Sequence, residues 1–132
     1  MNNRDIAEEW FKMAEIDFDS ANFLLAMKPV PFEIICYHCQ QCVEKYLKGF
    51  IALNGGQILK THDLLILNKE CVNFKNEFKE IENECMELTD YGVQVRYPFH
   101  IEIEDYDVQN ALKNTQKAID LVKKIIEKDY KD

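Results

Sequence analysis

The chain has 132 residues, 47% of them hydrophobic and 30% charged, with a net charge of −8; this profile is typical of one globular domain, which we expect to span residues 1–132. The negative charge disfavours nonspecific nucleic-acid binding, which needs lysine and arginine to displace phosphate counterions, so any nucleic-acid site must be a local basic cleft. No apolar run approaches the roughly 20 residues of a membrane span, and no apolar signal segment opens the chain, so we expect a cytoplasmic protein with reduced cysteines.

The apolar residues follow a helical period along almost the whole chain. The expected helices run over about 4–27, 32–54, a short stretch opening at Thr61, 74–91, and 107–129. On the first helix, the predicted apolar face is Ile6, Trp10, Met13, Ala14, Phe18, Ala21, Leu24 and Leu25. Thr61 is the expected N-cap of the short helix, and Gly92 is expected to end the fourth. These elements predict an all-α fold, an antiparallel four-helix bundle with one additional short helix.

Residues 93–104, "VQVRYPFHIEIE", depart from the helical period because apolar and other residues alternate. Alternation is the period of an extended chain. Since a lone strand has no partner within a helical bundle, we expect an extended arm before the last helix. It would lie across the bundle or pair with a second copy of itself.

Three cysteines at Cys36, Cys39 and Cys42 raise the question of a metal site. One helix presents two of them to a common ion but not all three, and structural zinc usually takes four ligands. Cysteine also fits an apolar stripe as a small apolar residue. That stripe is Ile35, Cys36, Cys39, Val43, Tyr46, Leu47 and Phe50. We therefore expect core packing here, with no metal site and no cofactor.

The opposite side of the same helix is polar. His38, Gln41, Lys45 and Lys48 recur at steps of three and four residues, so they share one side. One interpretation is a solvated surface. The other is the polar wall of a cleft, in which the two lysines would attract phosphate.

Three short stretches together resemble the HEPN domain (higher eukaryotes and prokaryotes nucleotide-binding). The first is Gln40, Gln41, Glu44, Lys45 and Lys48; the second is Thr61, His62, Asp63 and Leu64; the third is Arg96, Tyr97 and Pro98. The resemblance covers essentially the whole chain. It implies a helical bundle, frequent dimerisation, binding of nucleotides or RNA, and a minimal nucleotidyltransferase as partner, in some members as a toxin–antitoxin pair. Many members are metal-independent ribonucleases, whose sequence signature is an arginine and a histidine separated by four to six residues.

The chain departs from that ribonuclease signature, because three residues separate Arg96 from His100. Side chains four apart on a helix are about 6 Å from each other, whereas in an extended chain they are about 13 Å apart. Pro98 disfavours helix and biases Tyr97 towards extended geometry. A productive Arg96–His100 pair therefore needs a sharp bend or two chains.

The leading hypothesis is a nucleotide- or RNA-binding module, a homodimer that acts with a nucleotidyltransferase. Its expected binding residues are Gln41, Lys45, Lys48, Arg96 and Tyr97. Thr61, His62 and Asp63 are assigned chiefly to starting the short helix. One alternative is a ribonuclease toxin with Arg96 and His100 as catalytic residues, and another is a purely structural partner subunit.

Overall fold

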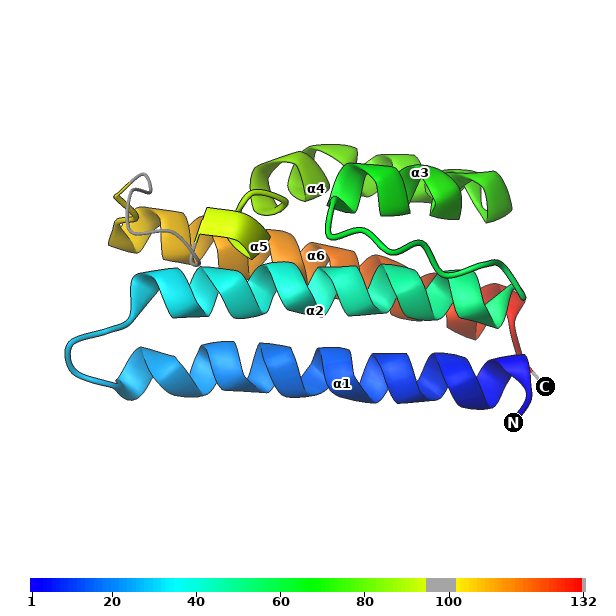
Figure 1. The fold of residues 1–132 in the computed structure, drawn as a ribbon, viewed down its shortest axis with the longest axis horizontal. Coiled ribbons are helices and arrows are strands. Elements are labelled where there is room, and N and C mark those ends of the chain that lie inside the picture. Colours follow the sequence, from blue (N-terminus) through cyan, green and yellow to red (C-terminus); the bar gives the residue numbers. More distant parts are fainter. Residues whose placement is uncertain (95–101, 132) are drawn as a thin grey trace.

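A computed structural model describes residues 1–94 and 102–131 of the chain. Within these ranges the regular structure is entirely helical, which confirms the predicted fold class (Figure 1). The helices are α1 (Asn3–Phe23), α2 (Phe32–Leu53), α3 (Leu64–Phe74), α4 (Glu82–Leu88), α5 (Tyr91–Gln94) and α6 (Asp105–Asp129). Two 3-10 segments, Leu24–Ala26 and Asn76–Ile81, follow α1 and α3. In the described ranges, no helix is both long and apolar enough to cross a membrane.

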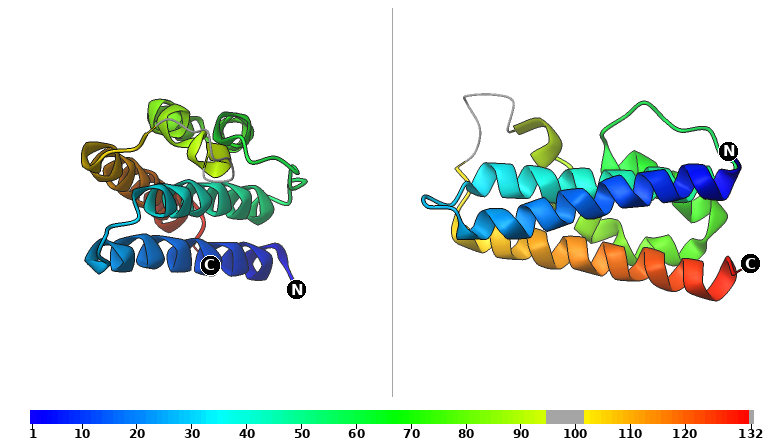
Figure 2. Two further views of the ribbon diagram at one scale, coloured as in Figure 1. Left: turned by 60° about the vertical axis from the view of Figure 1, so that its left-hand side comes forward. Right: turned by 90° about the horizontal axis from the view of Figure 1, so that it is seen from below.

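Helix α2 is the central element of the fold. It packs against α1 on one side and against α3, α4, α5 and α6 on the others. The long helices α1 and α2 run antiparallel, α6 lies beside α2, and the shorter helices α3 and α4 form a further layer (Figures 1 and 2). Both termini lie at the same end of the bundle, where the Arg4 guanidinium donates to the Tyr130 carbonyl. Side chains on α2 therefore reach every other part of the bundle.

Small residues allow α1 and α2 to approach closely. Ala7, Ala14 and Ala21 repeat every seven residues on α1, and all three are fully buried. On α2, a Cβ atom added to Gly49 would lie 2.5 Å from a ring carbon of Phe11. This close contact places alanines rather than large side chains at the centre of the seam between the two helices.

The predicted apolar face of α1 is partly wrong for that reason. Ile6 and Met13 were expected in the core, but they are 38% and 50% exposed. Ala14 and Ala21 are buried as predicted, and Phe18, Leu24 and Leu25 pack against the core. The outer side of α1 consequently carries exposed apolar side chains, among them Ile16 and Phe23.

The predicted apolar stripe of α2 is confirmed, since every member of it is buried. The five cysteines of the chain are all reduced and buried. Phe50 of this stripe packs against Phe78, with ring centroids 4.6 Å apart. Cysteine therefore serves as a small core residue between larger ones, as its position in the stripe indicated.

The expected fourth helix is interrupted, and its predicted bounds are wrong. Helix α3 continues to Phe74, Lys75 is extended with φ −145°, and a 3-10 segment precedes α4. The Asn68 side chain donates a hydrogen bond to the Phe78 carbonyl (2.9 Å) and so links α3 to the 3-10 segment that follows it. Gly92 does not end a helix but lies within α5.

The segment before the last helix also differs from the prediction at its ends. Val93 and Gln94 belong to α5 rather than to an extended arm, and α6 starts at Asp105 with a capping box between Glu104 and Asp107. Ile103 is buried, in agreement with an arm that presses a side chain onto the bundle. Arg96, Tyr97, Pro98 and His100 lie outside the described residues.

Candidate functional site

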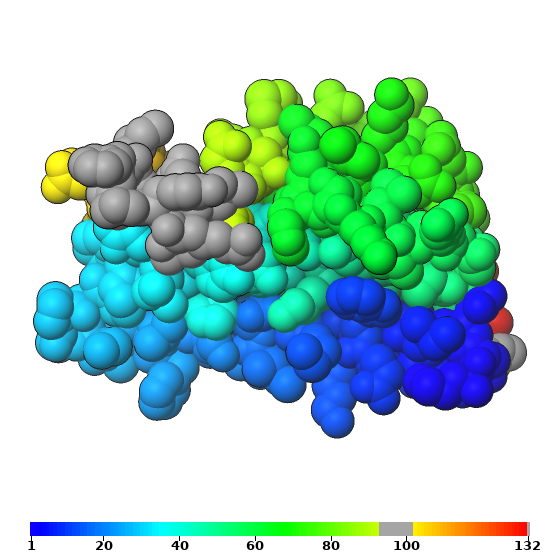
Figure 3. Space-filling model, in the orientation of Figure 1, coloured from blue at the N-terminus to red at the C-terminus, as the bar shows by residue number. Residues whose placement is uncertain are grey.

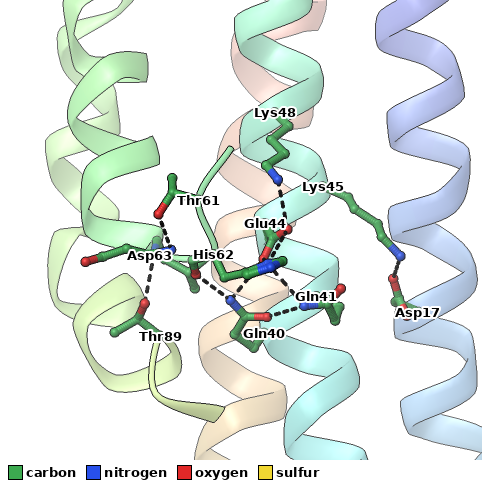
Figure 4. A network of polar contacts seen from close by, with 11 residues as sticks. Asp17, Gln40, Gln41, Glu44, Lys45, Lys48, Thr61, His62, Asp63 and Thr89 are labelled. Carbon is green, nitrogen blue, oxygen red and sulfur yellow. Dashed lines mark hydrogen bonds and ion pairs between the residues drawn. The ribbon is translucent and has the colours of Figure 1, made fainter. Parts of the chain in front are cut away.

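The loop between α2 and α3 is fixed to the bundle by polar contacts at the start of α3. Asp63 is the N-cap, since its carboxylate accepts from the Leu65 and Ile66 amides (2.9 and 3.4 Å). Thr61, predicted to be the cap, instead accepts from the Asp63 amide through its hydroxyl (3.1 Å). This turn carries His62 across the face of α2 (Figure 4).

Glu44, on α2, is the centre of a network of polar side chains (Figure 4). Glu44 is only 4% exposed, and its carboxylate accepts a hydrogen bond from the Lys48 ammonium at 3.0 Å. The Gln40 and Gln41 amides approach the same carboxylate at 3.3 and 3.4 Å. A buried charge needs such partners, because its desolvation otherwise costs about 3 kcal/mol or more.

His62 completes this network from the loop. Its Nδ1–H donates to the two Glu44 oxygens at 3.0 and 3.2 Å, and its carbonyl accepts from Gln40 Nε2 at 2.8 Å. A carboxylate without a proton only accepts, so this contact assigns the proton to Nδ1. The His62 side chain is 53% exposed although its partner Glu44 is 5% exposed. The network therefore has a buried anion and an imidazole open to solvent.

A second cluster of similar composition joins α2 to α1. The Asp17 carboxylate accepts from His38 Nδ1 at 2.9 Å and from the Lys45 ammonium at 2.5 Å. The three side chains are 11%, 26% and 20% exposed, respectively. Here all members are largely covered, so this cluster links two long helices.

The polar side of α2 is thus not a solvated surface, and its two lysines are both ion-paired. Lys48 is largely buried against Glu44, with its ammonium 5.8 Å from the centre of the Trp10 ring. Gln41 donates to Gln40 Oε1 at 2.7 Å. The predicted binding residues Gln41 and Lys48 therefore meet at Glu44, whereas Lys45 belongs to the Asp17 cluster.

Gly92 connects the network to α5. A Cβ atom added to Gly92 would lie 2.6 Å from Gln40 Cδ, so α5 touches the Gln40 amide directly. Helix α5 is the element that precedes the third stretch of the resemblance along the chain. The predicted site residues of that stretch, Arg96, Tyr97 and His100, lie outside the described residues, and their roles remain predictions.

The described residues contain no group of three or more histidine, cysteine or acidic side chains placed to hold a metal ion. Burial raises the pKa of the Cys36 thiol to about 12 and that of the Cys39 thiol to about 11. Burial also raises the pKa of Cys42 and Cys71. Metals and electrophiles react with the thiolate form, so these cysteines are inert core residues.

Three members of the site were not predicted from the sequence. Gln40 and Glu44 were noted as part of a motif but were given no role, and His62 was assigned only to the start of α3. The two motifs of the family resemblance carried a signal for this contact. The α2 motif contributes Glu44 and the motif that starts at Thr61 contributes His62. Figure 3 shows α1, α2 and the segment before α3 adjoining on one face of the molecule.

Residues 7–125 match the sequence profile of the HEPN domain. The chain belongs to the HEPN family. The family assignment made from the three short stretches is therefore confirmed.

Two other proteins are similar to this HEPN chain. "Putative toxin MJ1304" of Methanocaldococcus jannaschii is 26% identical, over 97% of this chain and 93% of that protein. The crystal structure of ST0689, an archaeal HEPN homologue, superposes with a TM-score of 0.69 at 24% identity, over 91% of this chain and 97% of the other. The second similarity shows the common helical fold.

Proposed function

We propose that this HEPN domain, spanning the chain, binds a nucleotide or RNA in the cytoplasm and acts with a partner protein. The observation that carries the proposal is the convergence of two family stretches on one buried carboxylate, Glu44. Buried ion pairs seldom stabilise a fold more than well-packed apolar residues would. A buried network that ends in exposed His62 and half-buried Gln41 is therefore better explained by a ligand than by stability.

The proposed ligand contacts are Gln41, Arg96 and Tyr97, with Lys45 and Lys48 as further cations. Each lysine already pairs with a carboxylate. A phosphate would have to compete with Asp17 or Glu44 for them, which weakens their contribution. Arginine offers a planar fork of donors for phosphate oxygens, so we assign the main phosphate contact to Arg96.

Binding of labelled single-stranded RNA and of nucleoside triphosphates, measured by fluorescence anisotropy at several salt concentrations, tests this proposal. Arg96→Ala is expected to weaken binding about tenfold or more, the usual loss with a charge-assisted bidentate contact. Lys45→Ala is expected to have a smaller effect that shrinks as salt rises. His100→Ala should change binding little. Failure of the wild-type protein to bind any of these probes would contradict the proposal.

Ribonuclease activity is a second candidate function. It is favoured by the relative that aligns over nearly the whole chain, because the name of that relative describes a toxin. Arg96 and His100 are the catalytic residues of this alternative. Metal-independent RNA cleavage requires an arginine to stabilise negative charge on the phosphate and a histidine to transfer a proton. Incubation with RNA in the presence of chelator separates the two functions. Loss of cleavage in both Arg96→Ala and His100→Ala, with binding retained in His100→Ala, would identify a ribonuclease.

The proposed partner is a minimal nucleotidyltransferase with a basic surface, since this chain carries a net charge of −8. Copurification of the two proteins after coexpression, with loss of the complex at high salt, is the expected result. A complex that forms while no nucleotide or RNA binds would instead support a purely structural subunit.

A homodimer is also proposed, on the basis of the outer side of α1. Ile6, Met13, Ile16 and Phe23 are exposed there, at intervals that follow the helix. Exposed apolar residues on one helix side are typical of an interface. Light scattering at micromolar concentration is expected to give the dimer mass, and a monomer mass would contradict this assignment.

A further inference from the structure

We infer that Glu44 and His62 form a proton-transfer site, in which His62 accepts the proton of a ribose 2′-hydroxyl and Glu44 positions the imidazole. The inference rests on the ribonuclease function proposed above as the second candidate. It adds a catalytic residue, His62, and a positioning residue, Glu44, that are separate from Arg96 and His100.

The geometry of the pair defines the free nitrogen of the imidazole. Since Nδ1 carries the proton donated to Glu44, the neutral ring has its lone pair at Nε2. The contacts among the described residues engage His62 through Nδ1 and through its carbonyl oxygen. Nε2 is therefore the nitrogen available for an external hydroxyl, and the side chain is 53% exposed.

The environment of Glu44 keeps the imidazole in this orientation. The carboxylate is fixed by Lys48 on one oxygen and by the Gln40 and Gln41 amides on the other. A carboxylate held in this way orients the imidazole and stabilises its protonated form after the proton has moved. Because the anion is buried, water competes little for it, and its attraction to imidazolium is stronger than at the surface.

The loop before α3 does not need the His62 imidazole to stay attached to the bundle. The loop is already fixed by Gln40 at the His62 carbonyl, by the Asp63 cap, and by Thr89, whose hydroxyl accepts from the Leu64 amide at 2.9 Å. Glu44 is already neutralised by Lys48 at 3.0 Å. An alanine at position 62 would keep all of these contacts, so the histidine side chain points to chemistry.

The step balances without a metal ion or redox partner. The 2′-hydroxyl gives its proton to His62 Nε2, and the 2′-oxygen forms a bond to the adjacent phosphorus. The bond from phosphorus to the 5′-oxygen breaks, and that oxygen takes a proton from His100, the histidine of the ribonuclease candidate, which regains a proton from water. The products are a 2′,3′-cyclic phosphate and a 5′-hydroxyl, and the imidazolium then returns its proton to solvent.

The test is cleavage of a fluorescent single-stranded RNA by the full chain in chelator, with a 2′-O-methyl copy of that RNA as substrate control. His62→Ala is expected to lower kcat by about 10²- to 10⁴-fold, the usual contribution of a general base, with KM changed less than about twofold. Added imidazole should restore part of the activity of His62→Ala. A merely structural role of His62 would not give this rescue.

His38→Ala is the matched control, because His38 makes the same Nδ1 contact with a carboxylate but is largely covered. It is expected to retain kcat within about twofold while losing stability, as expected for a broken side-chain contact. Glu44→Gln should lower kcat without rescue by imidazole, and its thermal unfolding transition shows whether it is folded. Should Glu44→Gln fail to fold, the imidazole rescue of His62→Ala decides alone.

The outcomes separate the inference from the function on which it rests. Wild-type cleavage with cyclic-phosphate ends that His62→Ala leaves unchanged would overturn the role of His62 and leave the ribonuclease standing. Wild-type protein that binds RNA without cleaving it would overturn both the ribonuclease and this site but not the binding module. Absence of both binding and cleavage would overturn all three.

Discussion

Asp17 and Glu44 are each bound by one histidine and one lysine, yet the two clusters differ in where the histidine lies. His38 comes from α2 and is 26% exposed between two long helices, whereas His62 comes from a loop and is 53% exposed. Glu44 also receives two glutamine amides, which Asp17 does not among the described contacts. The same chemistry therefore joins helices at Asp17 and presents an imidazole at Glu44. The number of buried partners, rather than the presence of histidine, distinguishes the candidate site.

Removal of the carboxylates is expected to give the largest difference between the two clusters. Glu44→Ala leaves the Lys48 ammonium buried without its anion and should lower the free energy of unfolding by about 3–5 kcal/mol. Asp17→Ala leaves the more exposed Lys45 and His38 and should cost about 1–3 kcal/mol. Urea denaturation followed by circular dichroism measures both. Equal losses would show that the clusters do not differ in burial as described.

Alkaline pH tests the burial of α2, which carries residues of both clusters. Burial raises the pKa of Cys39 from 9.0 to about 11, although a contact with Thr115 acts in the opposite direction. The folded chain therefore keeps a proton that the unfolded chain releases, so this stabilisation is complete below pH 9 and is lost as pH rises to about 11. At about 1.4 kcal/mol per pKa unit, Cys39 contributes roughly 2–3 kcal/mol to that fall.

Cys39→Ala is the control for the pH experiment, because alanine does not titrate. Its free energy of unfolding should fall less between pH 9 and pH 11 than that of the wild type, when both are measured by urea denaturation. Parallel curves for the two proteins would mean that Cys39 is less buried than the structure indicates.

Gly92→Ala perturbs only the Glu44 cluster. The added methyl group meets the Gln40 amide at 2.6 Å, so we expect a loss of about 1–3 kcal/mol, as for other overpacked sites. Gly49→Ala, which meets Phe11 at 2.5 Å, is a matched control in the α1–α2 seam. NMR spectra should show the His62 imidazole signals shifted in Gly92→Ala and little changed in Gly49→Ala. The reverse pattern would contradict the contact between Gly92 and Gln40.

Asp63→Ala loosens the loop that carries His62 without touching Glu44, and has the smallest expected effect. Loss of an N-cap costs about 1 kcal/mol, whereas Thr61→Val, which removes only one turn contact, should cost less. Thermal unfolding of the two variants measures the difference. A larger loss for Thr61→Val would restore Thr61 as the cap that the sequence predicted.

The sequence predicted the long helices and the buried stripe of α2, because large apolar residues and cysteines recur there at helical intervals. The face of α1 was predicted less well. Large residues such as Ile6 and Met13 suggested a core, but the close approach at Gly49 selects the alanines. The 3-10 segment Asn76–Ile81 escaped prediction because Phe74, Phe78 and Ile81 stay at helical intervals, and no proline or glycine lies within it.

The site itself was only partly predictable. Gln41 and Lys48 were identified from their spacing on α2, and both take part in the network. Glu44 was not, because a carboxylate followed by lysines on a helix usually indicates a solvated surface. Its role depends on His62, which is 18 residues away in sequence. Such a contact is fixed by the path of the loop over α2, and local patterns carry no information about that path.

The contact between Gly92 and Gln40 has a mechanical consequence. The Gln40 amide holds the His62 carbonyl with its nitrogen and leaves no room for a side chain at position 92. A displacement of α5 towards α2 must therefore move this amide, and a movement of the loop at His62 must pull on it from the other side. One side chain on α2 thus makes the positions of the loop and of α5 interdependent, although the two elements are about thirty residues apart in the chain.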